Sequence, residues 1–272
     1  MHMVNLHIVA QALRILVPLL YGAVAAGYVV EFYQNRDRHF SWTTIFFIIG
    51  IAFHLLLLFV LFLVQNRLPY DTGFKGLLFV AFMVSLLFFW MDHFLGEIRY
   101  GAFLFPVIFA VTGMASAFLN RGIPLPKQLL SFYFVVHATL LFLAYSCFLL
   151  SFVIASMYLL QHRQIKSHHL GGLFKRLPSL SDMDESVMRV DALGLGLLIL
   201  GIATGFLWME IVVGVPARIS LKIGLSSLVV IAYLTEHLLR IGKGWNGQRA
   251  CLISVIGFAF VLVTLLAGRH GY

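Results

Sequence analysis

The sequence predicts an all-α fold: a polytopic integral membrane helical bundle with about eight transmembrane helices. Two properties of the composition support this prediction, because 61% of the 272 residues are hydrophobic and only 11% are charged. A soluble globular protein typically carries about 25% charged residues, so a soluble core does not account for this chain. Repeated apolar runs of about 20 residues, each long enough to cross roughly 30 Å of hydrocarbon, do account for it.

Each span is placed where a long apolar run lies between short polar segments. The eight predicted spans cover residues 7–31, 44–64, 74–91, 101–119, 129–160, 190–209, 219–239 and 251–267. Pro18 and Pro106 fall within two of them, which is tolerated when neighbouring helices satisfy the freed backbone groups. Within the sizeable loop 161–189, the segment Pro178–Glu185 has the capping residues and early acids of a helix start. Residues 1–272 are predicted to form a single membrane domain.

The distribution of lysine and arginine predicts the orientation, because cytoplasmic loops carry an excess of these cations. One set of loops holds eleven cations, and the opposite set holds seven, with Arg14 an eighth near the first span. We therefore place the richer set, with segments 161–189 and 240–250, in the cytoplasm of a bacterium. Both termini then face the periplasmic or extracellular side of the cytoplasmic (inner) membrane. The N-terminal segment lacks a basic region and a small-residue cleavage site, so we assign it to the first span.

Four histidines lie in or beside the apolar runs, where an ionisable side chain is costly and usually marks a ligand or ion site. They are His54, His137, His237 and His270. Imidazole is the commonest protein ligand for metals, including haem iron. The predicted topology places His137 and His270 on the outer side, where they are candidate axial ligands of one haem iron. His54 and His237 are candidates for a second, intramembrane haem, although the helical rise separates them by roughly 10 Å along the membrane normal.

Each histidine also has a structural interpretation that involves no haem. His137 can be an interfacial hydrogen-bonding residue, and His270 a solvated residue of the tail. His54 can be a packing residue bonded to a neighbouring hydroxyl, and His237 a residue of the cytoplasmic interface.

Three further side chains are candidates for contact with haem. Arg218 and Lys222 are four residues apart and share a helix face, from which they can bind haem propionates. Both can instead anchor the outer interface by snorkelling, and Arg14 has the same two interpretations. Trp208 can stack on a porphyrin or belong to the aromatic belt at the membrane surface. Gly201 and Gly205 form a small-xxx-small pair, a pattern typical of close helix contact.

Several other classes of function find no support in the sequence. Cys147 and Cys251 both lie in apolar runs and form no CxxC pair, so neither a disulfide framework nor a thiol redox motif is indicated. There is no Ser/His/Asp arrangement, no phosphate-binding glycine loop and no pair of carboxylates within one span. The net charge of +8 comes from short loops between spans, which indicates membrane lipid rather than nucleic acid as a partner.

Groups of motifs in the C-terminal half occur in a specific order. They are Phe132–His137 with Leu143–Ser146, Leu177–Leu180 with Asp191–Gly194 and Leu200–Trp208, Tyr233–His237 with Gly244–Ala250, and Ile256–Phe258 with Gly268–Tyr272. Over residues 129–272 this order resembles the cytochrome c assembly family, the haem-handling membrane proteins typified by CcsA and CcmC. The resemblance implies b-type haem, bound non-covalently, with an outward ligand at His137 and an intramembrane ligand at His237.

One departure from the family pattern changes what the resemblance implies. Haem-ligating members have a tryptophan-rich loop ending in Trp-Asp-Pro between the spans that correspond to the sixth and seventh. Here the segment after Trp208 reads Met-Glu-Ile-Val-Val-Gly-Val-Pro-Ala-Arg-Ile, without that aromatic platform. The shorter pattern is similar to the HemX- and YpjD-type members. It implies a protein that binds or relays haem in cytochrome c assembly or haem homeostasis, and not an enzyme that attaches haem without an assembly partner.

Two alternatives remain. The chain can be a HemX-like membrane regulator that acts through the loop 161–189 on a haem-biosynthesis enzyme. It can also be a transporter of another small molecule.

Overall fold

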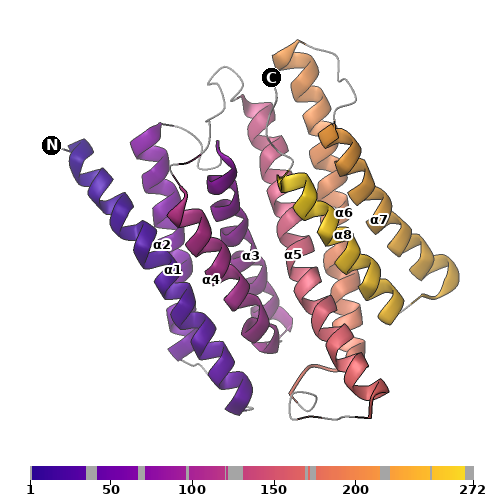
Figure 1. Ribbon diagram of the computed structural model, residues 1–272. Helices are drawn as coiled ribbons and strands as arrows, with labels where there is room; N and C mark the ends of the chain where they lie inside the picture. Colours follow the sequence, from indigo (N-terminus) through magenta and orange to yellow (C-terminus); the bar gives the residue numbers. More distant parts are fainter. Residues whose placement is uncertain are drawn as a thin grey trace. The chain divides into compact units, whose positions relative to one another are not determined.

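The computed structural model describes most of the chain. The described residues are 2–34, 42–66, 71–95, 98–119, 121, 131–168, 171, 176–214, 221–245 and 247–266. Every long element in this part of the chain is an α-helix, which confirms the predicted all-α class (Figure 1). The helices are α1 (His2–Gln34), α2 (Trp42–Gln65), α3 (Gly73–Leu95), α4 (Gly101–Ala117), α5 (Phe132–Lys166), α6 (Leu180–Trp208), α7 (Leu221–Lys243) and α8 (Gln248–Leu266).

Seven of the predicted spans are confirmed, and several of these helices are longer than predicted. Seven of the described helices are long and apolar enough to cross a membrane, and α4 is a shorter apolar helix of 17 residues. Helix α5 has 35 residues and α6 has 29. At a rise of 1.5 Å per residue they extend about 52 and 44 Å, well beyond roughly 30 Å of hydrocarbon. Pro18 lies inside α1 and Pro106 inside α4.

The predicted helix start in the loop 161–189 is confirmed, but the helix it begins is the sixth span itself. The backbone N–H of Asp182 donates to the Ser179 hydroxyl at 3.1 Å, which caps the first turn of α6. From there α6 continues without a break to Trp208. Acidic residues of the early turns therefore lie on the same rigid helix as the apolar span.

The chain divides into two compact units, Met1–Pro124 and Leu125–Tyr272, which we describe separately. In the N-terminal unit, each of α1 to α4 contributes one buried aromatic ring to a common cluster: Tyr28, Phe47, Phe88 and Phe105. Tyr28 stacks on Phe105 with centroids 5.0 Å apart, and Phe47 meets Phe105 edge to face at 4.8 Å. Such close aromatic packing stabilises helix association where lipid gives no hydrophobic driving force.

Two cations of the N-terminal unit are engaged inside it. Arg14 of α1 donates from Nε to the carbonyl of Ser116 and from a terminal nitrogen to that of Ala117 at 2.9 Å. It therefore neutralises the carbonyl end of α4, a role that sequence analysis did not consider. Lys75 donates to Gln65 and lies 2.5 Å from Asp71, with only 6% of its side chain exposed.

Removing the buried cation of this ion pair should destabilise the N-terminal unit. Lys75→Met removes the cation that lies 2.5 Å from the fully buried side chain of Asp71, which we expect to cost about 3–5 kcal/mol. The matched control is Arg189→Met, because Arg189 and Glu185 form the same i,i+4 pair with both side chains more than half exposed. That change should cost less than about 1 kcal/mol. Unfolding in mixed micelles measures both, and equal losses would contradict the prediction.

In the C-terminal unit, α5 lies along α6, and glycines of α6 allow a close approach (Figure 1). A Cβ at Gly201 would lie 2.7 Å from Leu141 Cδ2, and a Cβ at Gly205 would lie 2.6 Å from His137 Cε1. Both distances are shorter than non-bonded atoms tolerate, so only glycine fits without a shift. The structure thus confirms the close contact predicted from the Gly201/Gly205 pair, with His137 on its α5 side.

Candidate functional site

His137 is held against α6 by contacts with Gly201, Gly205 and Trp208. It lies in the second turn of α5, whose first turn is capped by the Ser131 hydroxyl. Its Nδ1 donates to the Gly201 carbonyl at 2.6 Å, its ring packs on Gly205, and it stacks nearly parallel on Trp208 with centroids 6.2 Å apart. A neutral imidazole that donates from Nδ1 carries its lone pair on Nε2, which is the usual arrangement of an iron-ligating histidine.

Trp208 lies inside the C-terminal unit. Its side chain is 7% exposed and contacts the rings of His137 and Phe134, the latter with centroids 5.3 Å apart. The ring lies nearly parallel to the His137 imidazole and restricts its plane. The predicted contact of Trp208 with a porphyrin, and its alternative as a residue of the aromatic belt, stay predictions.

Three other predicted residues of the outer site lie where the structure gives no side-chain description. Arg218 and His270 are outside the described residues, and for Lys222 only the backbone in the first turn of α7 is described. The pairing of His137 with His270, and of the two cations with propionates, stays a prediction.

His54 is fully buried in the N-terminal unit. Its Nδ1 lies 3.1 Å from the Tyr21 hydroxyl, and its ring meets the edges of Tyr21 and Phe82 at 5.6 and 5.3 Å between centroids. Tyr21 supplies the neighbouring hydroxyl that the packing interpretation requires. His237 belongs to the other compact unit, so a haem shared by His54 and His237 also stays a prediction.

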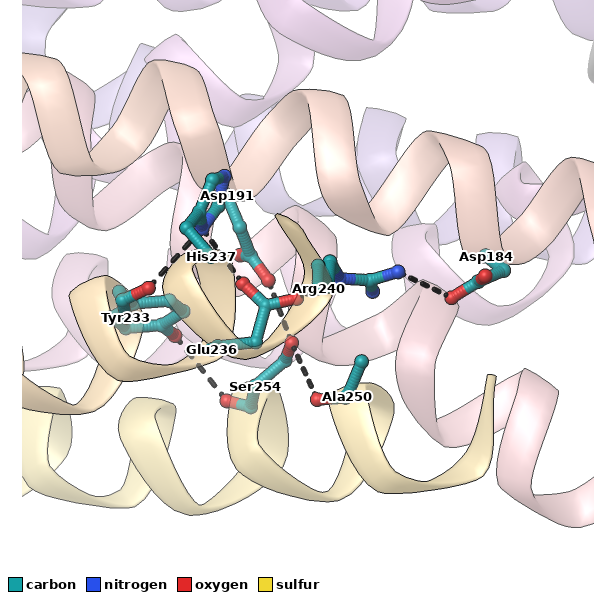
Figure 2. A network of polar contacts seen from close by, with 8 residues as sticks. All are labelled: Asp184, Asp191, Tyr233, Glu236, His237, Arg240, Ala250 and Ser254. Atoms are coloured by element: carbon teal, nitrogen blue, oxygen red, sulfur yellow. Dashed lines mark hydrogen bonds and ion pairs between the residues drawn. The ribbon is translucent and has the colours of Figure 1, made fainter. Parts of the chain in front are cut away.

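His237 lies in a polar network that joins α6, α7 and α8 (Figure 2). Its Nδ1 is 3.1 Å from the Tyr233 carbonyl, one turn earlier in α7, and 2.9 Å from Glu236 Oε2. Arg240 donates from Nε to Glu236 Oε1 and from a terminal nitrogen to Asp184 Oδ1 at 2.8 Å. The side chain of Glu236 is fully buried, and that of Arg240 is 4% exposed.

A second carboxyl of the network lies deeper between the helices. Asp191 of α6 is fully buried, and the Ser254 hydroxyl of α8 donates to its Oδ2 at 2.6 Å. The Tyr233 hydroxyl donates to the Ser254 carbonyl at 3.3 Å, so α7 is tied to α8 beside the same carboxyl. Buried ionisable groups within spans are costly, and their position favours a functional role.

The sequence did not predict this network. Its two buried carboxyls do not lie within one span, because Asp191 comes from α6 and Glu236 from α7. The available signal was that each acid lies in an apolar run, where it needs a partner from another helix. Among the described residues, no group of three or more His, Cys, Asp or Glu side chains has the arrangement of a metal site. Haem needs only one or two axial ligands from the protein, so single histidines suit it.

The comparisons with known proteins identify the family. Residues 42–270 match the family described as Cytochrome C assembly protein. The chain belongs to the cytochrome c assembly protein family. This confirms the resemblance that the order of motifs predicted, and it extends the match into the N-terminal half.

Individual relatives agree with this assignment. The chain is 36% identical over 99 residues to Protein HemX of Brevibacillus brevis and 26% identical over 136 residues to Protein HemX of Bacillus subtilis (strain 168). The first match spans 36% of this chain and 36% of that relative, and the second spans 50% of this chain and 49% of that relative. It is also 22% identical to the cytochrome c biogenesis protein CcsA of Trieres chinensis, over 90% of this chain and 93% of that protein.

Proposed function

We propose that this protein binds b-type haem non-covalently in the membrane and holds or relays it during cytochrome c assembly or haem homeostasis. The observation that carries the proposal is the arrangement of His137, whose Nδ1 donates to the Gly201 carbonyl and whose ring stacks on Trp208. The hydrogen bond and the stacked ring fix the plane of the imidazole, and a neutral ring that donates from Nδ1 has its lone pair on Nε2, as haem-ligating histidines do. Membership of the cytochrome c assembly family supports the same function.

The residues of the outer site have distinct roles in this proposal. His137 and His270 supply axial imidazoles, and Arg218 and Lys222 bind the propionates. Haem, when bound, supplies its own iron chemistry, and the protein supplies ligands, orientation and an apolar surround. Cys147 and Cys251 are both buried without a disulfide, one in α5 and one in α8, which supports non-covalent binding.

A second candidate function is a membrane regulator that acts on a soluble haem-biosynthesis enzyme. Helices α5 and α6 extend beyond the thickness of the hydrocarbon, and the early turns of α6 expose the Glu185–Arg189 pair. Under the proposed topology, these turns lie in the cytoplasm of a bacterium and both termini lie outside. A stable complex between the purified protein and a cytosolic enzyme would favour this candidate.

Absorption spectra of the purified protein test the haem proposal. Wild-type protein should show a Soret band with reduced α and β bands of b type, and acidified acetone should extract the haem completely. His137→Ala should lower haem occupancy severalfold or convert the iron to high spin, and added imidazole should restore part of the spectrum. Absence of haem from the wild type, even after haem is added, would contradict the proposal.

Two glycines of α6 provide a matched control for the same measurement. Gly205→Ala places a methyl group 2.6 Å from His137 Cε1, whereas a Cβ at Gly196 meets nothing within 4 Å. Both changes add one methyl group to the same helix, so their effects on helix propensity are alike. Gly205→Ala should alter the haem spectrum in the direction of His137→Ala, and Gly196→Ala should leave it unchanged. An equal response of the two variants would show that Gly205 does not position His137.

A further inference from the structure

Within the described part of the chain, the polar contacts of His237 involve only one of its two ring nitrogens. Nδ1 donates to the Tyr233 carbonyl at 3.1 Å, and a carboxylate oxygen, Glu236 Oε2, lies 2.9 Å from the same nitrogen. Nε2 is buried and has no hydrogen-bond partner among the described residues. A buried nitrogen lone pair without a partner is costly, and coordination of a metal ion by this nitrogen would satisfy it.

Glu236 is fixed by a chain of ionic contacts that leads away from the histidine. Its Oε1 accepts from Arg240 Nε, and Arg240 also binds Asp184 at 2.8 Å. The chain therefore runs from Asp184 on α6, through Arg240 and Glu236 on α7, to His237 (Figure 2). Arg240 places a positive charge against Glu236 in a buried position, where a carboxylate without a cation would be strongly disfavoured.

An ionised carboxylate beside Nδ1–H has a known effect on a histidine ligand. It fixes the tautomer and the ring orientation, and it makes the opposite nitrogen a stronger electron donor. Stronger donation stabilises the oxidised iron and lowers the reduction potential of the haem. The Tyr233 carbonyl accepts from the same nitrogen and would fix the tautomer by itself. It carries no negative charge, however, so it cannot strengthen donation in the way that a carboxylate does.

We propose that Glu236, held by Arg240 and Asp184, is a positioning residue that makes His237 a strongly donating axial ligand of haem. The inference rests on the proposed function, because it requires that the protein binds haem. The alternative is that the ionic chain only ties α6 to α7. A purely structural role predicts no effect on the reduction potential of a haem in a folded variant.

Redox titration of the haem in purified protein tests the proposal, with the folded state checked by gel filtration and circular dichroism. Glu236→Gln should raise the midpoint potential and change the low-spin resonance signal, because the amide no longer places a negative charge beside Nδ1. The matched control is Glu185→Gln, which removes an exposed carboxylate of α6 from an i,i+4 pair. That variant should keep the wild-type potential.

A His237→Ala background distinguishes the two explanations. His237→Ala should remove the haem population that responds to Glu236→Gln, and adding Glu236→Gln should not change the remaining haem. The role of Glu236 is overturned if folded Glu236→Gln keeps the wild-type midpoint potential, or if the potential shifts equally with and without His237. In both cases the haem proposal stands. Wild-type protein without haem overturns both.

If Glu236→Gln does not fold, Arg240→Lys tests the same chain. Lysine keeps the positive charge but lacks the Nε donor that fixes Glu236. A smaller upward shift of the potential supports the proposal, and no shift in the folded variant overturns it.

Discussion

Replacing Arg240 with methionine is expected to unfold the C-terminal unit or leave it marginally stable. Arg240 is the cation bound by both Glu236 and Asp184, and the Glu236 side chain is fully buried. Without the guanidinium, a buried carboxylate must remain charged without a partner or take up a proton. Removing one partner of a buried ion pair typically costs about 3–5 kcal/mol, a large fraction of the stability of a small domain. Thermal unfolding in detergent measures the loss.

Two further variants show whether the loss comes from the buried charge. Lys243→Met removes an exposed cation from the last turn of the same helix and should change the unfolding temperature little. Glu236→Gln combined with Arg240→Met should recover part of the lost stability, because the double variant leaves no negative charge at position 236. If Arg240→Met is as stable as Lys243→Met, the buried carboxyls do not depend on this arginine.

The helices could be predicted from the sequence because the bilayer requires long apolar runs, and such runs are visible residue by residue. The residues at which the helices begin and end were harder to predict from the sequence. Helix α6 begins at Leu180 rather than near 190, because Ser179 caps it and the polar early turns continue the same backbone hydrogen bonds. Polarity marks where a helix leaves the hydrocarbon, but it does not mark where the helix ends.

The candidate histidines could be selected by residue type alone, since an imidazole in an apolar run needs an explanation. The side chains and carbonyls that contact these histidines could not be selected in this way. The Gly201 carbonyl, Trp208 and Glu236 become partners through packing between helices, which no local pattern encodes. The buried pairs of Lys75 and Arg240 also show that two cations counted as loop residues are neutralised inside the protein. One comes from each side of the predicted membrane, so the difference between the sides is unchanged.

Expressed as the only assembly factor, the chain is expected to produce no covalent cytochrome c. Attachment of haem requires that its vinyl groups be held beside the incoming thiols of the apocytochrome. Orientation of this kind can supply about 7–11 kcal/mol of a reaction barrier, so its absence reduces the rate by many orders of magnitude. The segment Met209–Ile219 has no aromatic residue from which to build such a platform. Trp208, which precedes it, is buried against His137 and Phe134.

The measurement is haem staining of a reporter cytochrome c in a host that lacks its own assembly system. A CcsA-type protein with the tryptophan-rich loop, co-expressed with its own partners, provides the positive control. Adding the present chain to that control tests whether it changes the yield by delivering or retaining haem. Covalent haem on the reporter with this chain as the sole assembly factor would contradict the prediction. The residues proposed to hold haem would then also suffice to orient it for attachment, without an aromatic loop between α6 and α7.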